Sequence, residues 1–305
     1  MKHLLLILCP LLLAAFLGCN YSVSSQSASI SKAQPHASPT PEVYPQQLND
    51  IFVDEDKLSY NGYDVLRLKK KVKYEYPKES GETKSDLIEV SYAIVKRNTR
   101  TLAKFEGVYF GLGNATDFGL FSLLAGDSKQ LIVSQTIPRG GRHWVVSLSP
   151  DFRALFDGGD YGVGREEFNV IDVDKDGTYE ISLPVTAFYA YSDVIATGNT
   201  PLPEILFKYD RATGKYLPAN QMFQEYALRG IEQKIAKLDS SDELLYRARV
   251  MDIVLQYIYA SKEKDGWLFY DGEYKLTDKE ELKSKMKATL KGQPVYRYMY
   301  RQSAT

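Results

Sequence analysis

The sequence has little cysteine, little histidine and almost no net charge, and each shortage excludes a class of function. Only two of the 305 residues are cysteine and only three are histidine. Both cysteines lie in the first 19 residues, so the rest of the chain can form neither an internal disulfide nor a thiolate zinc site. The formal net charge of −1 offers no basic excess to displace counterions, so we expect no nucleic-acid partner.

Signatures of common catalytic centres are also missing from the sequence. His143 is the only histidine after residue 48, which excludes a multi-histidine zinc site and makes any Ser-His-Asp triad depend on this residue. Its place in RGGRHWVV, at a strand edge beside a glycine-rich turn, favours a structural role. The segment GVGREE, which begins at Gly162, lacks the third glycine of a dinucleotide fingerprint. The sequence therefore predicts no catalytic residue.

The first 19 residues have the pattern of an export signal. Lys2 and His3 precede LLLILCPLLLAAFL, a run of roughly 14 apolar residues that is shorter than the ~20 needed to span a bilayer. The run leads into Gly18 and Cys19, and here the chain resembles bacterial lipoproteins, in which the cysteine after the signal becomes lipidated and N-terminal. The resemblance implies that Cys19 carries the lipid.

The lipoprotein pattern is matched with two departures. Phe16 stands where the family usually has Leu, and Leu17 stands where a small residue is usual. The alternative is an ordinary signal peptide with an incidental cysteine. Lipidation is favoured because Cys19 would otherwise be a lone free thiol in an oxidising compartment. Two or more acyl chains would anchor the protein stably to a membrane, with the outer membrane or cell surface preferred.

The remaining chain divides into three regions by composition and pattern. Residues 20–48 are rich in Ser, Pro, Ala and Gln and have few apolar side chains, which predicts a disordered tether. Residues 49–218 carry strand signals, and residues 219–305 carry helix signals. We therefore predict an α+β fold, in which an antiparallel β-rich domain, a sandwich or propeller-like set of sheets, is followed by a C-terminal helical region.

The strand signals are alternation of apolar and charged residues, with turn residues between the segments. Between Leu66 and Tyr76 apolar and charged residues largely alternate, and Asn61-Gly62 before them predicts a two-residue hairpin. Glycine, proline, asparagine or aspartate separates the other predicted strands. These are 87–96, 101–110, 118–124, 130–137, 143–149, 167–173, 179–191 and 203–210.

The helix signals after residue 218 are apolar residues at helical spacing behind capping motifs. Ser240 with Glu243, and Thr277 with Glu280, each predict a capping box at the start of a helix. The second helix is rich in lysine. We interpret these lysines as its solvated face, and binding to lipid headgroups is the alternative.

One segment, FNVIDVDKDGTYEI over 168–181, carries a pattern with specific chemistry. Asp172, Asp174 and Asp176 occupy alternate positions, and Gly177 follows them. Ca²⁺ takes about six to eight oxygen ligands, and carboxylates so spaced converge on one ion where the chain turns sharply. Gly177 permits that turn because glycine accepts positive φ. The predicted ligands are Asp172, Asp174, Asp176, Glu180 and the backbone carbonyl of Thr178.

This loop resembles the DxDxDG loops of EF-hands and, more closely, the strand-loop-strand versions of integrin-type and FG-GAP repeats. The helical EF-hand is disfavoured because position twelve of the loop is Leu183 instead of a bidentate Glu. The resemblance implies a structural calcium ion. A Lys175-Asp176-Gly177 hairpin turn with solvated acids is the alternative.

These features predict a membrane-anchored envelope lipoprotein with one structural calcium site. We expect a non-enzymatic binding or scaffolding protein, with an envelope protein or a polysaccharide as its partner. A carbohydrate- or peptidoglycan-directed hydrolase with paired carboxylates is the alternative. A third hypothesis is a lipid-surface module that uses the lysine-rich helix.

Overall fold

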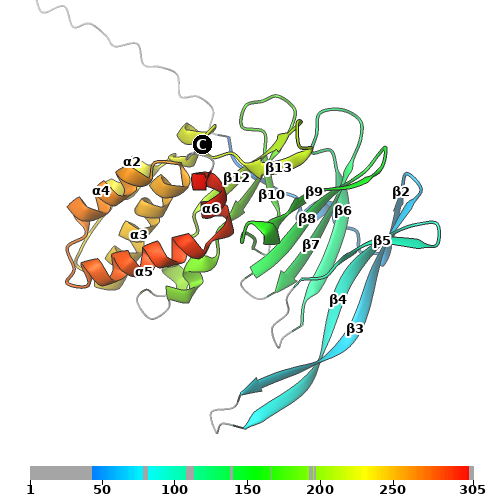
Figure 1. Ribbon diagram of the computed structural model, residues 1–305, viewed down its shortest axis with the longest axis horizontal. Coiled ribbons are helices and arrows are strands. Elements are labelled where there is room, and N and C mark those ends of the chain that lie inside the picture. Colours follow the sequence, from blue (N-terminus) through cyan, green and yellow to red (C-terminus); the bar gives the residue numbers. More distant parts are fainter. Residues whose placement is uncertain are drawn as a thin grey trace, which may run out of the picture. The chain divides into compact units, whose positions relative to one another are not determined.

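The computed structural model describes residues 43–77, 82–107, 113–137, 140–165, 167–191, 195 and 197–301. These described residues form one compact unit. The predicted export signal, Cys19 and the tether up to residue 42 lie outside the described residues. Within the compact unit three antiparallel sheets are followed by helices (Figure 1), so the predicted α+β class is confirmed.

The first sheet is dominated by one long hairpin. Asn61 and Gly62 have φ values of 50° and 75°, which confirms the predicted tight turn between its first two strands. The two central strands pair over 15 residues each and project away from the other sheets (Figure 1). In order, the sheet consists of β2 (Lys57–Tyr60), β3 (Tyr63–Pro77), β4 (Thr83–Arg97) and β5 (Arg100–Phe105).

The second sheet lies between two cores. It consists of β6 (Ala115–Phe121), β7 (Gln130–Ile137), β8 (Gly140–Leu148) and β9 (Phe152–Asp157), joined as a meander. Leu131 and Val133 of β7 pack against the first sheet, whereas Ile132 between them packs towards the third sheet and the helices. Because both of its faces are covered, β7 is buried at six consecutive positions, Gln130 to Gln135, instead of at alternate ones.

The third sheet is a meander with one added edge strand. It has the order β1-β10-β11-β12-β13, formed by β1 (Gln46–Gln47), β10 (Asn169–Ile171), β11 (Glu180–Pro184), β12 (Glu204–Asp210) and β13 (Lys215–Pro218). Gln46–Gln47 fall in the segment predicted as a tether, and the next residue, Leu48, is fully buried. The ordered unit therefore begins earlier than the predicted boundary at residue 49.

The helices follow the third sheet and share its core. They are α1 (Gln224–Ala227), α2 (Ile231–Ala236), α3 (Glu243–Tyr259), α4 (Glu263–Glu273), α5 (Lys279–Gly292) and α6 (Pro294–Arg301). Val254 of α3 and Met286 of α5 are buried in the same cluster as Ile181 and Phe207 of the sheet. The sheets and the helical region are thus joined by one apolar core.

Both predicted capping boxes are wrong in position. The N-cap of α3 is Asp242, whose carboxylate accepts the backbone N–H of Leu245 at 3.1 Å. The N-cap of α5 is Asp278, and its side chain makes no capping hydrogen bond. Aspartate is as good a cap as serine, so Asp242 displaced the predicted start of α3, whereas α5 begins without a side-chain cap. The predicted strand over 179–191 is also too long, since a 3-10 helix occupies Ala187–Tyr191.

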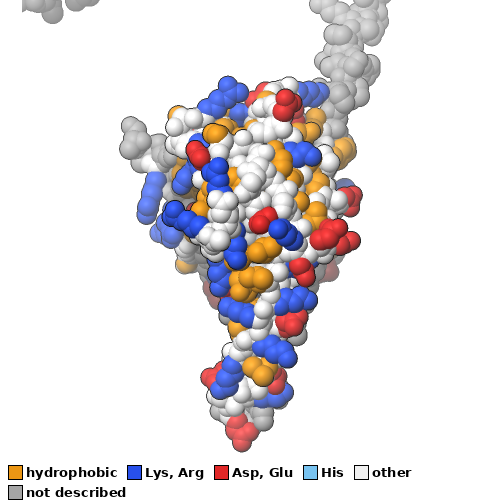
Figure 2. Space-filling model, turned by 90° about the vertical axis from the view of Figure 1, so that its right-hand side faces the viewer, with side chains coloured by type: hydrophobic (Ala, Val, Ile, Leu, Met, Phe, Trp, Pro, Cys, Tyr) orange, Lys and Arg blue, Asp and Glu red, His pale blue; other side chains and the backbone are white. Residues whose placement is uncertain are grey.

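The outer face of the first sheet is charged in both signs. Figure 2 shows lysine, arginine, aspartate and glutamate interspersed with apolar side chains on the face that includes the long hairpin. Charges also pair along the hairpin on both of its faces, as in Lys69 with Glu89 at 3.5 Å and Lys84 with Asp86 at 3.3 Å. Such exposed pairs contribute little to stability, but they keep a long β-hairpin from associating edge to edge.

Candidate functional site

The acidic loop connects β10 to β11 and is folded by its own side chains. Asp172 accepts the backbone N–H groups of Asp176 and Gly177, each at 3.1 Å. Asp176 in turn accepts the N–H of Thr178 at 2.7 Å. Gly177 has φ of 79°, the left-handed conformation that the sequence predicted for it. These bonds bend the loop so that its carboxylates face inwards.

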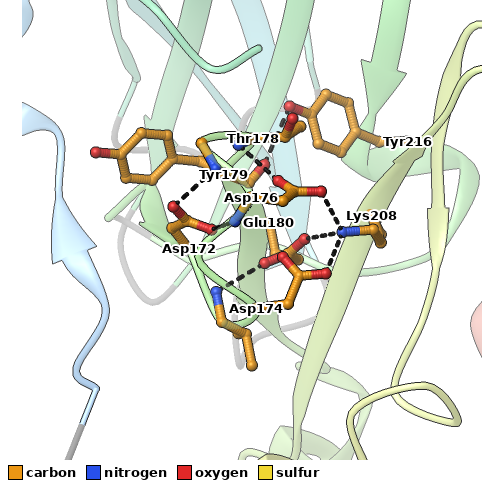
Figure 3. A network of polar contacts seen from close by, with 10 residues as sticks. Asp172, Asp174, Asp176, Thr178, Tyr179, Glu180, Lys208 and Tyr216 are labelled. Atoms are coloured by element: carbon orange, nitrogen blue, oxygen red, sulfur yellow. Dashed lines mark hydrogen bonds and ion pairs between the residues drawn. The ribbon is translucent and has the colours of Figure 1, made fainter. Parts of the chain in front are cut away.

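Three of the predicted ligands are brought together. One carboxylate oxygen each from Asp172, Asp174 and Asp176 lies within 4.8 Å of the others. Figure 3 shows the three side chains around the loop. Asp174 and Asp176 are exposed, and Asp172 is half-buried. An oxygen that accepts a backbone N–H keeps a second lone pair, so the bonds that fold the loop do not prevent these carboxylates from binding a cation.

Glu180 completes the acidic group from the first residue of β11. Its carboxylate is fully buried, and one oxygen accepts the N–H of Val173 at 2.9 Å. Burial raises the pKa of Glu180, and the hydrogen bond from Val173 only partly offsets this effect. By contrast, the N–H of Thr178 lowers the pKa of Asp176. A buried carboxylate at the base of the loop requires a positive partner.

Lys208 of β12 supplies a positive charge to this group. Its ammonium lies 2.7 Å from Asp174, 3.2 Å from Asp176 and 3.0 Å from Glu180 (Figure 3). Burial alone would lower the pKa of Lys208, but its hydrogen bonds to these carboxylates outweigh burial and raise that pKa. The lysine therefore stays charged and acts as an internal counter-ion.

The sequence analysis did not predict Lys208 as part of the site, although the pairing of β11 with β12 would have indicated it. The register pairs Ile181 with Phe207, which places Glu180 and Lys208 opposite each other at the next position along β11 and β12. Opposite residues on antiparallel strands share a face of the sheet. A register derived from the apolar pattern of the two predicted strands would have found the pair.

The residues present fit a hard divalent cation as well as an ammonium group. Four carboxylates against one lysine leave an excess of three negative charges at the loop. The loop is also held from outside, because Tyr179 donates its N–H to the carbonyl of Leu123 at 2.8 Å and accepts the Tyr216 hydroxyl at 3.1 Å. Preorganised oxygen ligands with excess negative charge are what Ca²⁺ binding requires.

His143 is buried in the second sheet and is structural. Its Nδ1 lies 2.8 Å from the Ser134 hydroxyl, and its Nε2 lies 2.7 Å from the carbonyl of Arg165. A ring nitrogen beside a carbonyl must carry the proton, so Nδ1 accepts from Ser134. Burial lowers the pKa of His143 to about 4, so the ring is neutral at pH 7. Both side chains are fully buried, which leaves no access for a substrate.

A groove of about 770 Å³ runs along β4 and β6 and contains other carboxylates, those of Asp54, Glu89 and Asp117. Asp117 lies 3.3 Å from Arg67, which also contacts Asp56 at 3.4 Å. Burial raises the pKa of Asp117, and Asp54 adds to this effect while Arg67 opposes it.

Comparison of the chain with protein-family models, with curated proteins and with solved structures gives no significant match. Among the residues that the structure describes, no helix has the length and apolar character needed to cross a membrane.

Proposed function

We propose that this protein is an envelope lipoprotein, anchored through Cys19, whose third sheet is stabilised by a calcium ion in the β10–β11 loop. The observation that supports the calcium site best is the convergence of three carboxylates within 4.8 Å above the buried Glu180. Asp172, Asp174, Asp176 and Glu180 would hold the ion, together with the backbone carbonyl of Thr178. Bound calcium supplies fixed positive charge between strands.

The role of this ion is structural rather than catalytic. The carboxylates of Asp172 and Asp176 tie the loop backbone to itself, and Glu180 with Lys208 links β11 to β12. A cation here would fasten three strands of one sheet and stabilise the fold by mass action. A buried carboxylate that is held by its neighbours is poorly placed to exchange protons with a substrate.

The proposed role is non-enzymatic binding or scaffolding at the outer membrane or cell surface, with an envelope protein or a polysaccharide as the partner. The anchor rests on the pattern around Cys19 alone. The lysine-rich α5 buries Leu282, Met286 and Leu290 in the core, whereas its Lys287 and Lys291 are exposed. This arrangement supports the solvated-face interpretation of its lysines over a lipid-binding one.

Two experiments test this proposal separately. Cys19→Ser should move the protein from the membrane fraction to the soluble fraction of fractionated cells, and unchanged membrane association would contradict the anchor. Replacing Asp172 and Asp174 with Ala should abolish a calcium-induced rise in melting temperature. As a control, Asp210→Ala removes an acidic turn residue that is bonded to Thr213. It should lower stability but leave the calcium response intact.

A carbohydrate- or peptidoglycan-directed hydrolase is the second candidate, and the groove along β4 and β6 favours it. Asp117 is half-buried and has a raised pKa, the property of a general acid, and Asp54 and Glu89 line the same groove. If this candidate is right, purified protein should release reducing ends from peptidoglycan, and Asp117→Asn should reduce that rate at least about a hundredfold. Absence of turnover by the wild type would contradict it.

A further inference from the structure

The acidic loop is attached to the second sheet as well as to its own sheet. Tyr179, the last residue of the loop before β11, donates its backbone N–H to the carbonyl of Leu123 at 2.8 Å. The Tyr179 ring also meets the Phe121 ring edge-on, with the two ring centroids 5.3 Å apart. Leu123 belongs to residues 122–129, which connect β6 to β7. This segment, the β6–β7 connection, therefore contacts the loop that the proposed calcium ion would occupy.

One buried glutamine gives the β6–β7 connection its shape. The amide oxygen of Gln130 accepts the backbone N–H groups of Leu123 at 2.8 Å and of Leu124 at 3.2 Å. The amide nitrogen of the same side chain donates to the carbonyl of Ser128 at 3.1 Å. Gln130 is 1% exposed, whereas residues 125–129 are all exposed. Because one side chain bonds both ends of the connection, the exposed residues between them are positioned from the buried end.

The two attachments of the connection to the rest of the protein differ in strength. Leu123 is fully buried in the core that the second and third sheets share with the helices. At the other end, the backbone N–H of Lys129 donates to the Tyr60 hydroxyl at 3.2 Å, and this bond to the first sheet is exposed to solvent. Exposed hydrogen bonds with little packing around them open at low free-energy cost. The order of the connection therefore depends mainly on the bond between Leu123 and Tyr179.

The Thr178–Tyr179 peptide group forms the bridge between the acidic loop and the connection. Its N–H is the group bonded to Leu123, and its carbonyl is the backbone ligand proposed for calcium. The peptide bond is trans, so its C=O and N–H point in opposite directions from one rigid plane. An ion on the carbonyl would hold the N–H against Leu123. An opening of the loop that releases the ion would also break this bond.

The charge of the acidic loop favours such an opening when no divalent ion is bound. Asp172, Asp174, Asp176 and Glu180 carry four negative charges against the one positive charge of Lys208. These like charges repel one another, and a divalent cation removes two of the three excess negative charges. Calcium would shift the loop towards its closed arrangement because it binds that arrangement preferentially.

We infer that calcium bound in the acidic loop also orders the β6–β7 connection, through the Thr178–Tyr179 peptide group. The inference rests on the calcium site proposed above and adds a regulatory consequence to it. Residues 125–129 then form an exposed segment whose order follows the calcium concentration. Without calcium, each opening of the acidic loop frees the connection as well.

The test is hydrogen–deuterium exchange of the full chain, measured by mass spectrometry in chelator and in calcium, with calorimetry on the same samples. Calcium at about 100 times its dissociation constant should slow any exchange that requires release of the ion by about a hundredfold. We expect residues 172–179 and residues 122–130 to slow by the same factor, within about twofold. The connection between α2 and α3 is the reference, since the N–H of its Ser241 is likewise bonded to a carboxylate, that of Asp239, at 2.9 Å. Its exchange should change by less than about twofold.

Two variants separate calcium in the acidic loop from calcium on the connection itself. Asp174 is exposed and contacts Lys208, so Asp174→Asn keeps the hydrogen bonds that fold the loop. It should weaken calcium binding about tenfold and reduce the slowing of both segments about tenfold at the same calcium concentration. Asp127→Asn is the matched control, because Asp127 is an exposed aspartate of the connection. It should leave both slowing factors within about twofold of the wild type.

Calorimetry distinguishes failure of this inference from failure of the calcium site. Heat of binding together with slowing confined to residues 172–179 would overturn the inference and leave the calcium site in place. Slowing of residues 122–130 that is lost in Asp127→Asn would also overturn it, because the ion would then bind the connection directly. Neither heat nor slowing in either segment would overturn both proposals.

Discussion

Replacing Lys208 with Met should destabilise the protein without calcium and strengthen its binding of calcium. The substitution removes the ammonium that contacts Asp174, Asp176 and Glu180 but keeps an apolar stem of similar length. In the absence of a divalent ion, Glu180 would then be a buried carboxylate without a positive partner. Calcium would meet the same four carboxylates without a competing cation.

The size of the loss in stability depends on how exposed the three carboxylates that contact Lys208 are. Removing one member of a buried ion pair costs about 3–5 kcal/mol. Glu180 is fully buried, whereas the side chains of Asp174 and Asp176 are 39% and 43% exposed, so we expect the lower end, about 3 kcal/mol. For a domain of this size that corresponds to a drop in melting temperature of roughly 6–12 °C. Because a flexible lysine can withdraw from an incoming ion, the expected gain in calcium affinity is about tenfold, or ~1.4 kcal/mol.

The assay is thermal unfolding in chelator and in saturating calcium, followed by circular dichroism, with calcium affinity from calorimetry. Lys175→Met is the matched control. Lys175 is an exposed lysine of the acidic loop, and its replacement removes the same charge as Lys208→Met does. It should shift stability by no more than about 0.5 kcal/mol. Equal melting temperatures of Lys208→Met and the wild type in chelator would refute the counter-ion role of Lys208.

Further predictions concern the second sheet and the helices. Since burial lowers the pKa of His143 from 6.5 to about 4, its contribution to stability is present above pH 6.5 and is lost as the pH falls to 4, by about 3 kcal/mol in total. His143→Gln should therefore flatten the fall in unfolding free energy between pH 6.5 and 4 in urea titrations, and an unchanged slope would contradict the neutral buried ring. Gly119→Ala should destabilise the fold by about 2 kcal/mol or more, because a Cβ there would lie 2.3 Å from the carbonyl of Ile51. Gly272→Ala, with open space around it in α4, should instead stabilise by up to about 1 kcal/mol in the same denaturation assay.

Local patterns in the sequence predicted much of the fold. The Asn61-Gly62 turn and the alternation after it gave the hairpin of the first sheet, and 130–137 was predicted with the bounds of β7. Elements with weaker patterns were missed, including β9 and the short edge strand β1, which pairs with β10 far along the chain. Edge strands of two residues carry no periodicity, and their pairing depends on tertiary packing.

The candidate site was predicted only in part, again because sequence patterns are local and tertiary packing is not. The spacing of Asp172, Asp174 and Asp176 and the bend at Gly177 are local, so the sequence contained them. Lys208 reaches the site through the register between β11 and β12. A local sequence motif does not contain that register.

The most direct test of the calcium site is a calorimetric titration of chelator-treated full chain with Ca²⁺, with Mg²⁺ as the comparison. The loop geometry predicts one calcium ion per chain, and tighter binding of Ca²⁺ than of Mg²⁺, since Ca²⁺ accepts several carboxylate ligands at once whereas Mg²⁺ keeps most of its waters. A titration that produces neither heat nor any shift in melting temperature would mean that no metal site exists there and that Lys208 serves the acidic group as counter-ion without a metal.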